Sequence, residues 1–395
     1  MIKTLSGYVQ HWLERANERL PNINPIWEKE LRANFRGWRF FVTYLTIMAL
    51  FSFIMLIIYL GYMASRSGGF SMESSQIGQN VFINLQSLQL LIVFFIIPGF
   101  TATAICSERE KLTYELLISS GLSPAKIVWG KFLAGLTLAL IIFVSTLPLV
   151  SLSFLFGGVS ALQIIISYLI LLILSAVIIS FSLNASAVSK SSSRAIVTTY
   201  SIILLLGFFF IFPLIGLIAL MGSLGVISSH TPFRYFPGLG TAASLFQVVM
   251  SALIVPLYFI GSLFAFNIIV AINSLKPTFA NRTTNLKIFY LAFFSIGLSI
   301  LLTCFYVEIS PTDPDRETAV IAFISVFLGL STLSSFFSLG TPSLSPRLTQ
   351  QITALPGWKK SLRMFYPGNL NGFNFSVKIN TLLALVFFGL LFPLT

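Results

Sequence analysis

The feature that most constrains this chain is a series of unbroken apolar blocks, most of them about 20 residues or longer. A helix of ~20 residues, rising about 1.5 Å per residue, crosses the ~30 Å hydrocarbon core of a bilayer. The blocks lack the periodicity of a half-buried helix or strand. We therefore predict an all-α fold, a polytopic transmembrane helical bundle of about nine spans. The predicted spans are Phe40–Met63, Leu85–Cys106, Phe132–Phe156, Ala161–Val188, Ala195–Met221, Ala243–Ile272, Ile288–Val307, Thr318–Leu339 and Val377–Leu394.

Composition supports this prediction. Of the 395 residues, 56% are hydrophobic and only 9% are charged. A water-soluble domain of this length would need more polar surface. The ninth block is short, so it either crosses the membrane or forms a re-entrant or interfacial segment.

The distribution of basic residues predicts the orientation of the bundle. With the N-terminus in the cytoplasm, all of the 24 Lys and Arg residues except Arg66, Arg234 and Arg316 fall in cytoplasmic segments. The opposite threading would contradict the positive-inside bias of membrane proteins. We attribute the net charge of +12 to contact with lipid headgroups and predict no nucleic-acid partner.

The predicted spans carry no ionisable side chain at mid-membrane depth. Proton-driven carriers usually need a carboxylate or a histidine there. Both histidines lie outside the spans, and neither cysteine has Cys or His neighbours at metal-ligand spacing. The only Gly-Lys pair, Gly130-Lys131, is preceded by Ala125 where a P-loop requires glycine. We therefore predict that this chain is not an enzyme and binds no cofactor or metal of its own.

Residues 1–39 are predicted to form two amphipathic helices on the cytoplasmic side. The second starts with Asn24 as N-cap and Pro25 at the first helical position. One face of this helix is aromatic and aliphatic and the opposite face is cationic, which is typical of a helix lying in the membrane surface. The apolar stripe consists of Trp27, Leu31, Phe35 and Trp38, and the cations are Lys29, Arg32, Arg36 and Arg39. The alternative is an ordinary positively charged flank of the first span.

The loop after the second span carries three carboxylates on a predicted short helix, Glu108 to Ile118. Its apolar patch consists of Leu112, Leu116 and Leu117, and Lys111 and Glu115 are spaced for an i,i+4 ion pair. Gly121 suits the end of this helix, and Ser123-Pro124 suits the start of the next one. Local physics leaves two interpretations open, a solvated connector and a docking element for a cytosolic partner.

The motifs of this loop, taken together with the N-terminal helix, resemble the type-2 permease family of ABC transporters. The matching elements are Thr103-Ala104-Ile105, Glu108-Arg109-Glu110 with Thr113, Leu116-Leu117, Leu122-Ser123-Pro124 and Gly130-Lys131. The stretch from Asn24 to Arg32 is similar to the family's entry into its connecting helix. As a combination these elements are specific, whereas each one alone is not.

The resemblance implies a function. In such permeases the loop helix is a coupling helix that sits in a cleft of a separate ATP-binding subunit. By this resemblance the chain is the permease subunit of an ATP-driven ABC-type exporter in a bacterial plasma (inner) membrane. Its implied partners are cytosolic ABC ATPase subunits carrying ATP and Mg, a second identical or similar permease chain, and membrane lipids. The implied ATPase-coupling residues are Glu108, Arg109, Glu110, Thr113, Glu115, Leu116 and Leu117.

The resemblance also implies a division of the chain. Residues 40–273 would form a six-span permease core with its coupling helix at 107–121. Residues 274–395 would add about three spans, with a cytoplasmic segment at 341–376. Two rival functions stay open at this point. One is an ion-gradient-driven carrier that uses neutral Asn side chains and backbone ligands, and the other is a non-transporting membrane scaffold.

Overall fold

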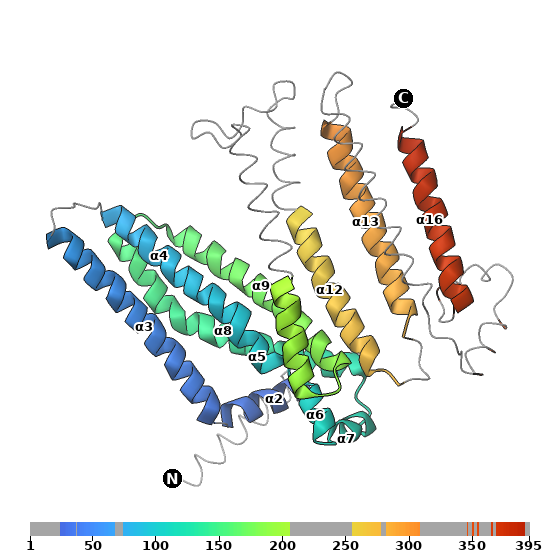
Figure 1. Ribbon diagram of the computed structural model, residues 1–395, viewed down its shortest axis with the longest axis horizontal. Coiled ribbons are helices and arrows are strands. Elements are labelled where there is room, and N and C mark those ends of the chain that lie inside the picture. Colours follow the sequence, from blue (N-terminus) through green and yellow to red (C-terminus); the bar gives the residue numbers. More distant parts are fainter. Residues whose placement is uncertain are drawn as a thin grey trace, which may run out of the picture. The chain divides into compact units, whose positions relative to one another are not determined.

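The computed structural model describes residues 24–36, 38–67, 74–205, 255–277, 282–308 and 369–391, and the single positions 346, 350, 354 and 365. These residues form helices and turns, with no strand among them (Figure 1). The predicted all-α fold class is thus confirmed for this part of the chain. Contacts divide the chain into two compact units, unit 1 (Met1–Leu205) and unit 2 (Leu206–Thr395), and each is described by itself.

Unit 1 consists of long apolar helices and a set of short helices at one end (Figure 1). In chain order they are α2 (Pro25–Arg36), α3 (Trp38–Ser67), α4 (Ser74–Leu91), η1 (Ile92–Ile96), α5 (Ile97–Thr101), α6 (Cys106–Glu110), α7 (Tyr114–Ser119), α8 (Pro124–Phe156) and α9 (Ala161–Val188), followed by a helix over Ser192–Leu205.

Local capping explains where several of these helices begin. The side-chain oxygen of Asn24 accepts a hydrogen bond from the Ile26 amide at 3.1 Å, and Pro25 follows as the first residue of α2. The Ser123 hydroxyl caps α8 in the same way, through the Lys126 amide. Both starts were predicted from sequence and are confirmed.

The second long helix changes its hydrogen bonding at Pro98. Proline has no N–H, and its ring crowds the carbonyl group four residues earlier. A single π-helical turn, η1, precedes it, and the Ile97 amide bonds to the carbonyl of Ile92. α4, η1, α5 and α6 together make one candidate span, Gly78–Glu110.

Four helices in the described part of the chain are long and apolar enough to cross a membrane. They are Phe41–Gly61, Gly78–Glu110, Pro124–Phe154 and Ala161–Val188. These coincide with the first four predicted spans, so the chain is an integral, multi-pass membrane protein. The total of about nine spans and the cytoplasmic N-terminus stay predictions, because most of the fifth predicted span and all of the eighth, Thr318–Leu339, lie outside the described residues.

The core of unit 1 lies between α3, α4 and α8. Its buried apolar residues are Ile47, Phe51, Val81, Leu85, Leu88, Ile92, Ile142 and Val150. Glycine at position 78 allows the start of α4 to lie close to the end of α8, because a Cβ added at Gly78 would lie 1.9 Å from the carbonyl oxygen of Gly157. The chain leaves α8 through Gly157 and Gly158, both at positive φ, which glycine adopts without steric cost.

Unit 2 contains α12 (Val255–Leu275), α13 (Thr284–Glu308) and α16 (Asn369–Leu391) among its described residues. The Tyr258 ring of α12 stacks on Phe293 of α13, with centroids 5.3 Å apart. The Tyr290 ring of α13 meets Phe375 of α16 edge-on, at 6.2 Å between centroids. Aromatic contacts therefore link all three helices. α12 and α13 overlap the predicted spans Ala243–Ile272 and Ile288–Val307, and α16 overlaps the ninth.

Candidate functional site

Four charged side chains from three helices meet at the end of unit 1 that carries α6 and α7. We call Lys29 and Glu30 of α2, Glu108 of α6 and Lys131 of α8 the lysine–glutamate cluster. The Lys131 ammonium lies 2.6 Å from Glu30 Oε1 and 3.1 Å from Glu108 Oε1, and its side chain is only 1% exposed. It also donates to the carbonyl of Ala104 at 2.8 Å. This buried cation thus has two hydrogen-bond acceptors, Glu30 and Ala104, and a second carboxylate, Glu108, at ion-pair distance.

The cluster fixes α2 against the start of α8. Lys29 adds a bridge to Glu108 at 3.2 Å from the exposed side. The Trp27 indole donates to Thr137 Oγ1 at 3.0 Å. Ile26 is buried where the two helices touch, and a Cβ at Gly130 would lie 2.7 Å from its Cβ. Glycine at 130 therefore permits the contact, and Lys131 next to it supplies the charge.

Arg109 and Glu110 bind two further helices. The Arg109 guanidinium donates to the carbonyl of Ala187, in the last turn of α9, at 2.8 Å. Glu110 accepts from the amide of Ser192 at 2.7 Å and also from its hydroxyl, at the first residue of the helix Ser192–Leu205. A cation at a helix C-terminus and an anion at a helix N-terminus both interact favourably with the helix dipole.

The three consecutive charged residues of α6 therefore each bind a different part of unit 1. Ser186 adds a fourth attachment, because its hydroxyl accepts from the amides of Ile105 and Cys106 at 3.0 and 3.1 Å. α6 is bonded to α2, α8, α9 and the helix after α9, and a displacement of α6 must strain or move all four.

The chain turns sharply between α6 and α7, where the sequence predicted one continuous helix. The Leu112 amide bonds to the Arg109 carbonyl at 3.1 Å and the Thr113 amide to the Glu108 carbonyl at 3.0 Å. Leu112 has a φ of +57°. These two bonds and a left-handed residue form a Schellman motif, which terminates α6. The prediction of a single helix from Glu108 to Ile118 is therefore wrong. The left-handed position of this motif is usually glycine, but here it is leucine, so nothing in the sequence indicated a break.

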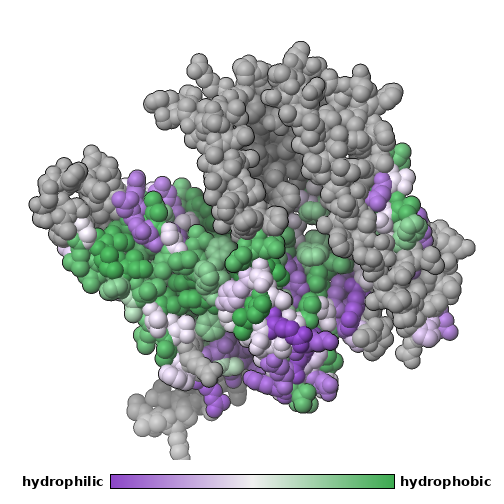
Figure 2. Space-filling view, in the orientation of Figure 1, coloured by the Kyte–Doolittle hydropathy of each residue, from purple (hydrophilic) through white to green (hydrophobic). Residues whose placement is uncertain are grey.

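The segment after this turn presents apolar side chains to the outside. Leu112 is 77% exposed and Leu116 is 70% exposed, and Ile118 is also exposed. Thr113 and Glu115 are exposed as well, whereas Leu117 is half-buried. α7 ends at Ser119 with Ser120 as its C-cap, and Gly121 follows at a φ of +76°, in agreement with the glycine predicted for the end of this helix. Figure 2 shows a hydrophilic surface at this end of unit 1 with apolar side chains within it. We call residues 111–121 the exposed turn.

The predicted coupling residues thus fall into two groups. Glu108, Arg109 and Glu110 are engaged within unit 1, whereas Thr113, Glu115 and Leu116 face outward. Contact with an ATPase stays a prediction for all seven residues. Sequence reasoning did not place Glu30, Lys131 and Ser192 in the site. Glu30 and Lys131 lie in motifs that were noted separately, and their opposite charges were the available signal.

The predicted membrane-surface helix is α2, and Trp38 begins α3 instead. Trp27 and Lys29 bind α8 and α6, while Arg32 pairs with Glu28 one turn earlier. Leu31 and Phe35 are half-buried, Arg36 is exposed, and Arg39 lies outside the described side chains. A position in the membrane surface stays a prediction for this helix.

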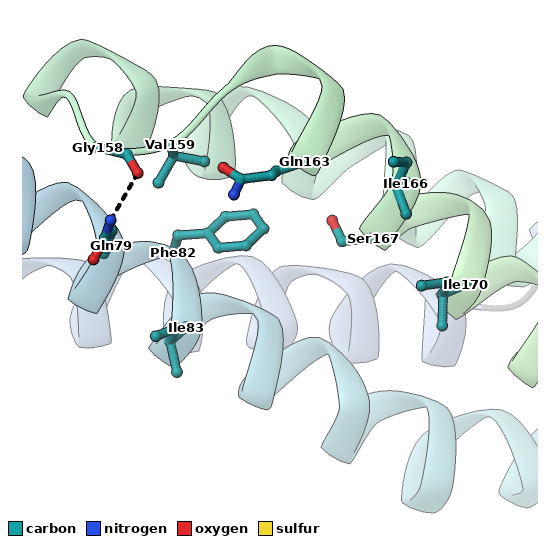
Figure 3. A pocket seen from close by; sticks show the side chains of 9 residues that line it. All are labelled: Gln79, Phe82, Ile83, Gly158, Val159, Gln163, Ile166, Ser167 and Ile170. Atoms are coloured by element: carbon teal, nitrogen blue, oxygen red, sulfur yellow. Dashed lines mark hydrogen bonds between the residues drawn. The ribbon is translucent and has the colours of Figure 1, made fainter. Parts of the chain in front are cut away.

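A groove lies between the starts of α4 and α9, away from the α6 end of these helices (Figure 3). It encloses about 380 Å³, and apolar side chains such as Phe82 and Ile170 form most of its lining. The Gln79 amide donates to the Gly158 carbonyl at 3.1 Å along one wall. None of its lining residues is charged. Further along α4, buried Gln89 donates to Thr146 of α8 at 2.7 Å and to Tyr168 of α9 at 2.8 Å.

α4 also carries a polar stripe on its outer face. Asn80, Asn84 and Ser87 are exposed there, within the candidate span Gly78–Glu110. Asn84 and Ser87 donate to the carbonyls of Asn80 and Ile83, one turn earlier in α4. Amide and hydroxyl groups are costly against lipid tails, so this face suits another protein surface or an aqueous path. Within the described residues, no group of three or more His, Cys, Asp or Glu side chains could hold a metal ion.

Comparison with known protein families finds a match, which covers part of the chain. No curated protein matches the chain. The model of the family described as ABC-2 family transporter protein matches residues 70–240, which include α4 to α9, Glu108 and Lys131 of the lysine–glutamate cluster, and the exposed turn. Residues 70–240 are therefore similar to the ABC-2 family of transporter proteins, and the chain that carries them is an integral, multi-pass membrane protein.

Proposed function

We propose that this chain is the membrane-spanning permease subunit of an ATP-driven exporter, energised by a separate cytosolic ATP-binding subunit that docks on the exposed turn. The observation that carries the proposal is the contrast between α6 and the residues after it. α6 is bonded to four other helices, whereas Leu112 and Leu116 stand exposed immediately beside it. Exposed leucines surrounded by polar groups are typical of a protein-binding surface.

The geometry supports a division of labour between the two groups of residues. Leu112, Glu115 and Leu116 would contact the ATPase, with Ile118 beside them. Glu108, Arg109 and Glu110 would transmit displacement into α2, α8, α9 and the following helix. Buried charge clusters have discrete arrangements and resist continuous deformation, so α6 would move with these helices as one body. Such coupling requires two membrane states that differ by no more than a few kcal/mol.

A second permease chain, identical or similar, would complete the transporter. The polar stripe of Asn80, Asn84 and Ser87 supports this, because it needs a surface other than lipid. ATP and Mg would be bound by the ATPase alone. The exposed turn would face the cytoplasm of a bacterial cell, in agreement with the positive-inside bias of the sequence.

The proposal is tested by Leu116→Asp and co-purification with a cytosolic P-loop ATPase encoded beside this chain. An aspartate at a 70% exposed position should leave membrane insertion and folding intact while placing a charge in the apolar contact. We expect at least tenfold less ATPase in the purified complex. Ser123→Asp is the matched control, because it adds the same charge to the same loop and preserves an N-cap acceptor.

Unchanged recovery of the ATPase with Leu116→Asp would reject docking on the exposed turn. Transport by purified vesicles that persists without ATP and collapses with an ion gradient would instead favour a secondary carrier. Absence of any transport together with recovery of other partners would favour a scaffold.

A further inference from the structure

Unit 2 concentrates positive charge where α12 ends and α13 begins. Lys276, Arg282 and Lys287 lie within twelve residues of one another. The sequence contains no Asp or Glu between Glu115 and Glu308, and none after Glu317. Glu308 is the last residue of α13, so it stands about 30 Å along the helix axis from Lys287. Glu308 is therefore the only carboxylate among the described residues of unit 2.

Three of the residues at this turn form a connected cluster. The Lys276 ammonium donates to the side-chain oxygen of Asn273 at 2.7 Å. The Arg282 guanidinium donates to the main-chain carbonyl of Lys276. We call Asn273, Lys276 and Arg282 the α12–α13 cationic cluster. Because an ammonium group can only donate, Lys276 fixes the orientation of the Asn273 amide, with its oxygen toward the lysine and its nitrogen away.

The cluster has two buried hydrogen-bond donors without a partner among the residues that the structure describes. Asn273 is 7% exposed, and its amide nitrogen is buried without a hydrogen-bond partner. The Arg282 Nε is also buried and has none. A buried unpaired donor costs roughly 1–3 kcal/mol, and more when the group is charged. An oxyanion is the kind of acceptor that would satisfy an amide or guanidinium donor beside a lysine.

A buried lysine, Lys287, follows Arg282 five residues later in the chain. The Lys287 side chain lies in the first turn of α13, is 2% exposed and stands 5.5 Å from the centre of the Phe375 ring. Burial also lowers the pKa of Lys276, which lies just beyond the end of α12. A bound anion would favour the charged form of that lysine and offset the cost of its burial.

We propose that the α12–α13 cationic cluster binds the phosphate group of an anionic membrane lipid. The position of the cluster at the end of α12 favours a lipid headgroup over a soluble phosphate. The cluster lies at the end of α12, an apolar helix of 21 residues that overlaps the sixth predicted span, and so would stand at the depth of the headgroups. Basic pockets between membrane helices are the sites that recognise such headgroups. This site is separate from the exposed turn of unit 1 and does not depend on the proposed ATPase contact.

Asn273→Asp provides the sharpest test. The substitution keeps the acceptor for Lys276 and nearly the same shape, but it replaces the unpaired donor with a negatively charged acceptor that repels phosphate. The full chain would be reconstituted in nanodiscs of phosphatidylglycerol or of phosphatidylcholine, and its melting temperature measured in each. We expect phosphatidylglycerol to stabilise the wild type and this difference to disappear in Asn273→Asp. In phosphatidylcholine, Asn273→Asp should melt at or above the wild-type temperature, which excludes misfolding.

Two further variants and one soluble probe complete the experiment. Arg282→Gln should also lose the stabilisation, and native mass spectrometry should show at least tenfold less retained phosphatidylglycerol. Arg36→Gln, an exposed cation of α2, should retain both and so measures general attraction to an anionic surface. Equal losses in Arg36→Gln and Arg282→Gln would overturn the proposal. Equal protection of detergent-solubilised protein by inorganic phosphate would overturn the assignment to lipid.

Discussion

Lys131→Met is the substitution that most directly tests the lysine–glutamate cluster. Lys131 is 1% exposed, and the Glu108 and Glu30 side chains that flank it are only 12% and 21% exposed. Removing the cation leaves two half-buried carboxylates facing each other, with Lys29 as the remaining partner of Glu108. Breaking a buried ion pair by deleting one partner costs about 3–5 kcal/mol. We expect a loss of stability of this size.

A compensated variant separates charge imbalance from lost packing. Lys131→Met combined with Glu30→Gln and Glu108→Gln removes the imbalance, and replacing a complete buried ion cluster by neutral groups is often close to neutral. We expect the triple variant to recover most of the loss. Lys111→Met is the control, because an exposed lysine of the same loop should change stability by less than about 0.5 kcal/mol.

The assay is reversible unfolding in mixed micelles, with stability taken from the denaturant midpoint. If the free energy of unfolding of Lys131→Met lay within about 1 kcal/mol of the wild-type value, the Lys131 charge would not stabilise the cluster as proposed. A triple variant as unstable as the single one would show that packing, and not charge balance, holds α2 to α6 and α8.

Two other predictions concern backbone geometry and close packing. Leu112→Gly should raise the free energy of unfolding by up to about 1–2 kcal/mol, and with it the melting temperature, because glycine adopts the left-handed conformation without steric cost. The same variant should recover less ATPase in co-purification, and a lower melting temperature would contradict the strain argument. Gly78→Ala should lower stability by about 1–3 kcal/mol, because its Cβ meets the Gly157 carbonyl, whereas Gly61→Ala, in open space, should be neutral or stabilising. Thermal unfolding compares the two, and equal effects would refute the packing argument.

The spans and helix starts were predictable because their signals are local. An apolar block of ~20 residues specifies a membrane helix by itself. Pro25 and Ser123-Pro124 likewise specify helix starts through their own fixed dihedrals and side-chain oxygens. The fold class and the first four spans needed nothing beyond such short-range information.

The cluster and the turn were not predictable, for different reasons. Glu30 and Lys131 are 101 residues apart, and only the packing of α2 on α8 brings their charges together. No periodicity in either segment carries that information. The break between α6 and α7 depends on Leu112 in a left-handed conformation that leucine rarely adopts. It is enforced by the attachments of Glu108 and Arg109, which are tertiary contacts.

Photo-crosslinking from position 116 tests directly whether the ATPase docks on the exposed turn. A photoreactive residue would replace Leu116 in one sample and Leu45, an exposed residue of α3, in another, each in inside-out membrane vesicles with the ATPase present. We expect an ATPase adduct from position 116 and none from position 45. An absence of the adduct from 116, or labelling of that position by a membrane-impermeant reagent from outside intact cells, would contradict it.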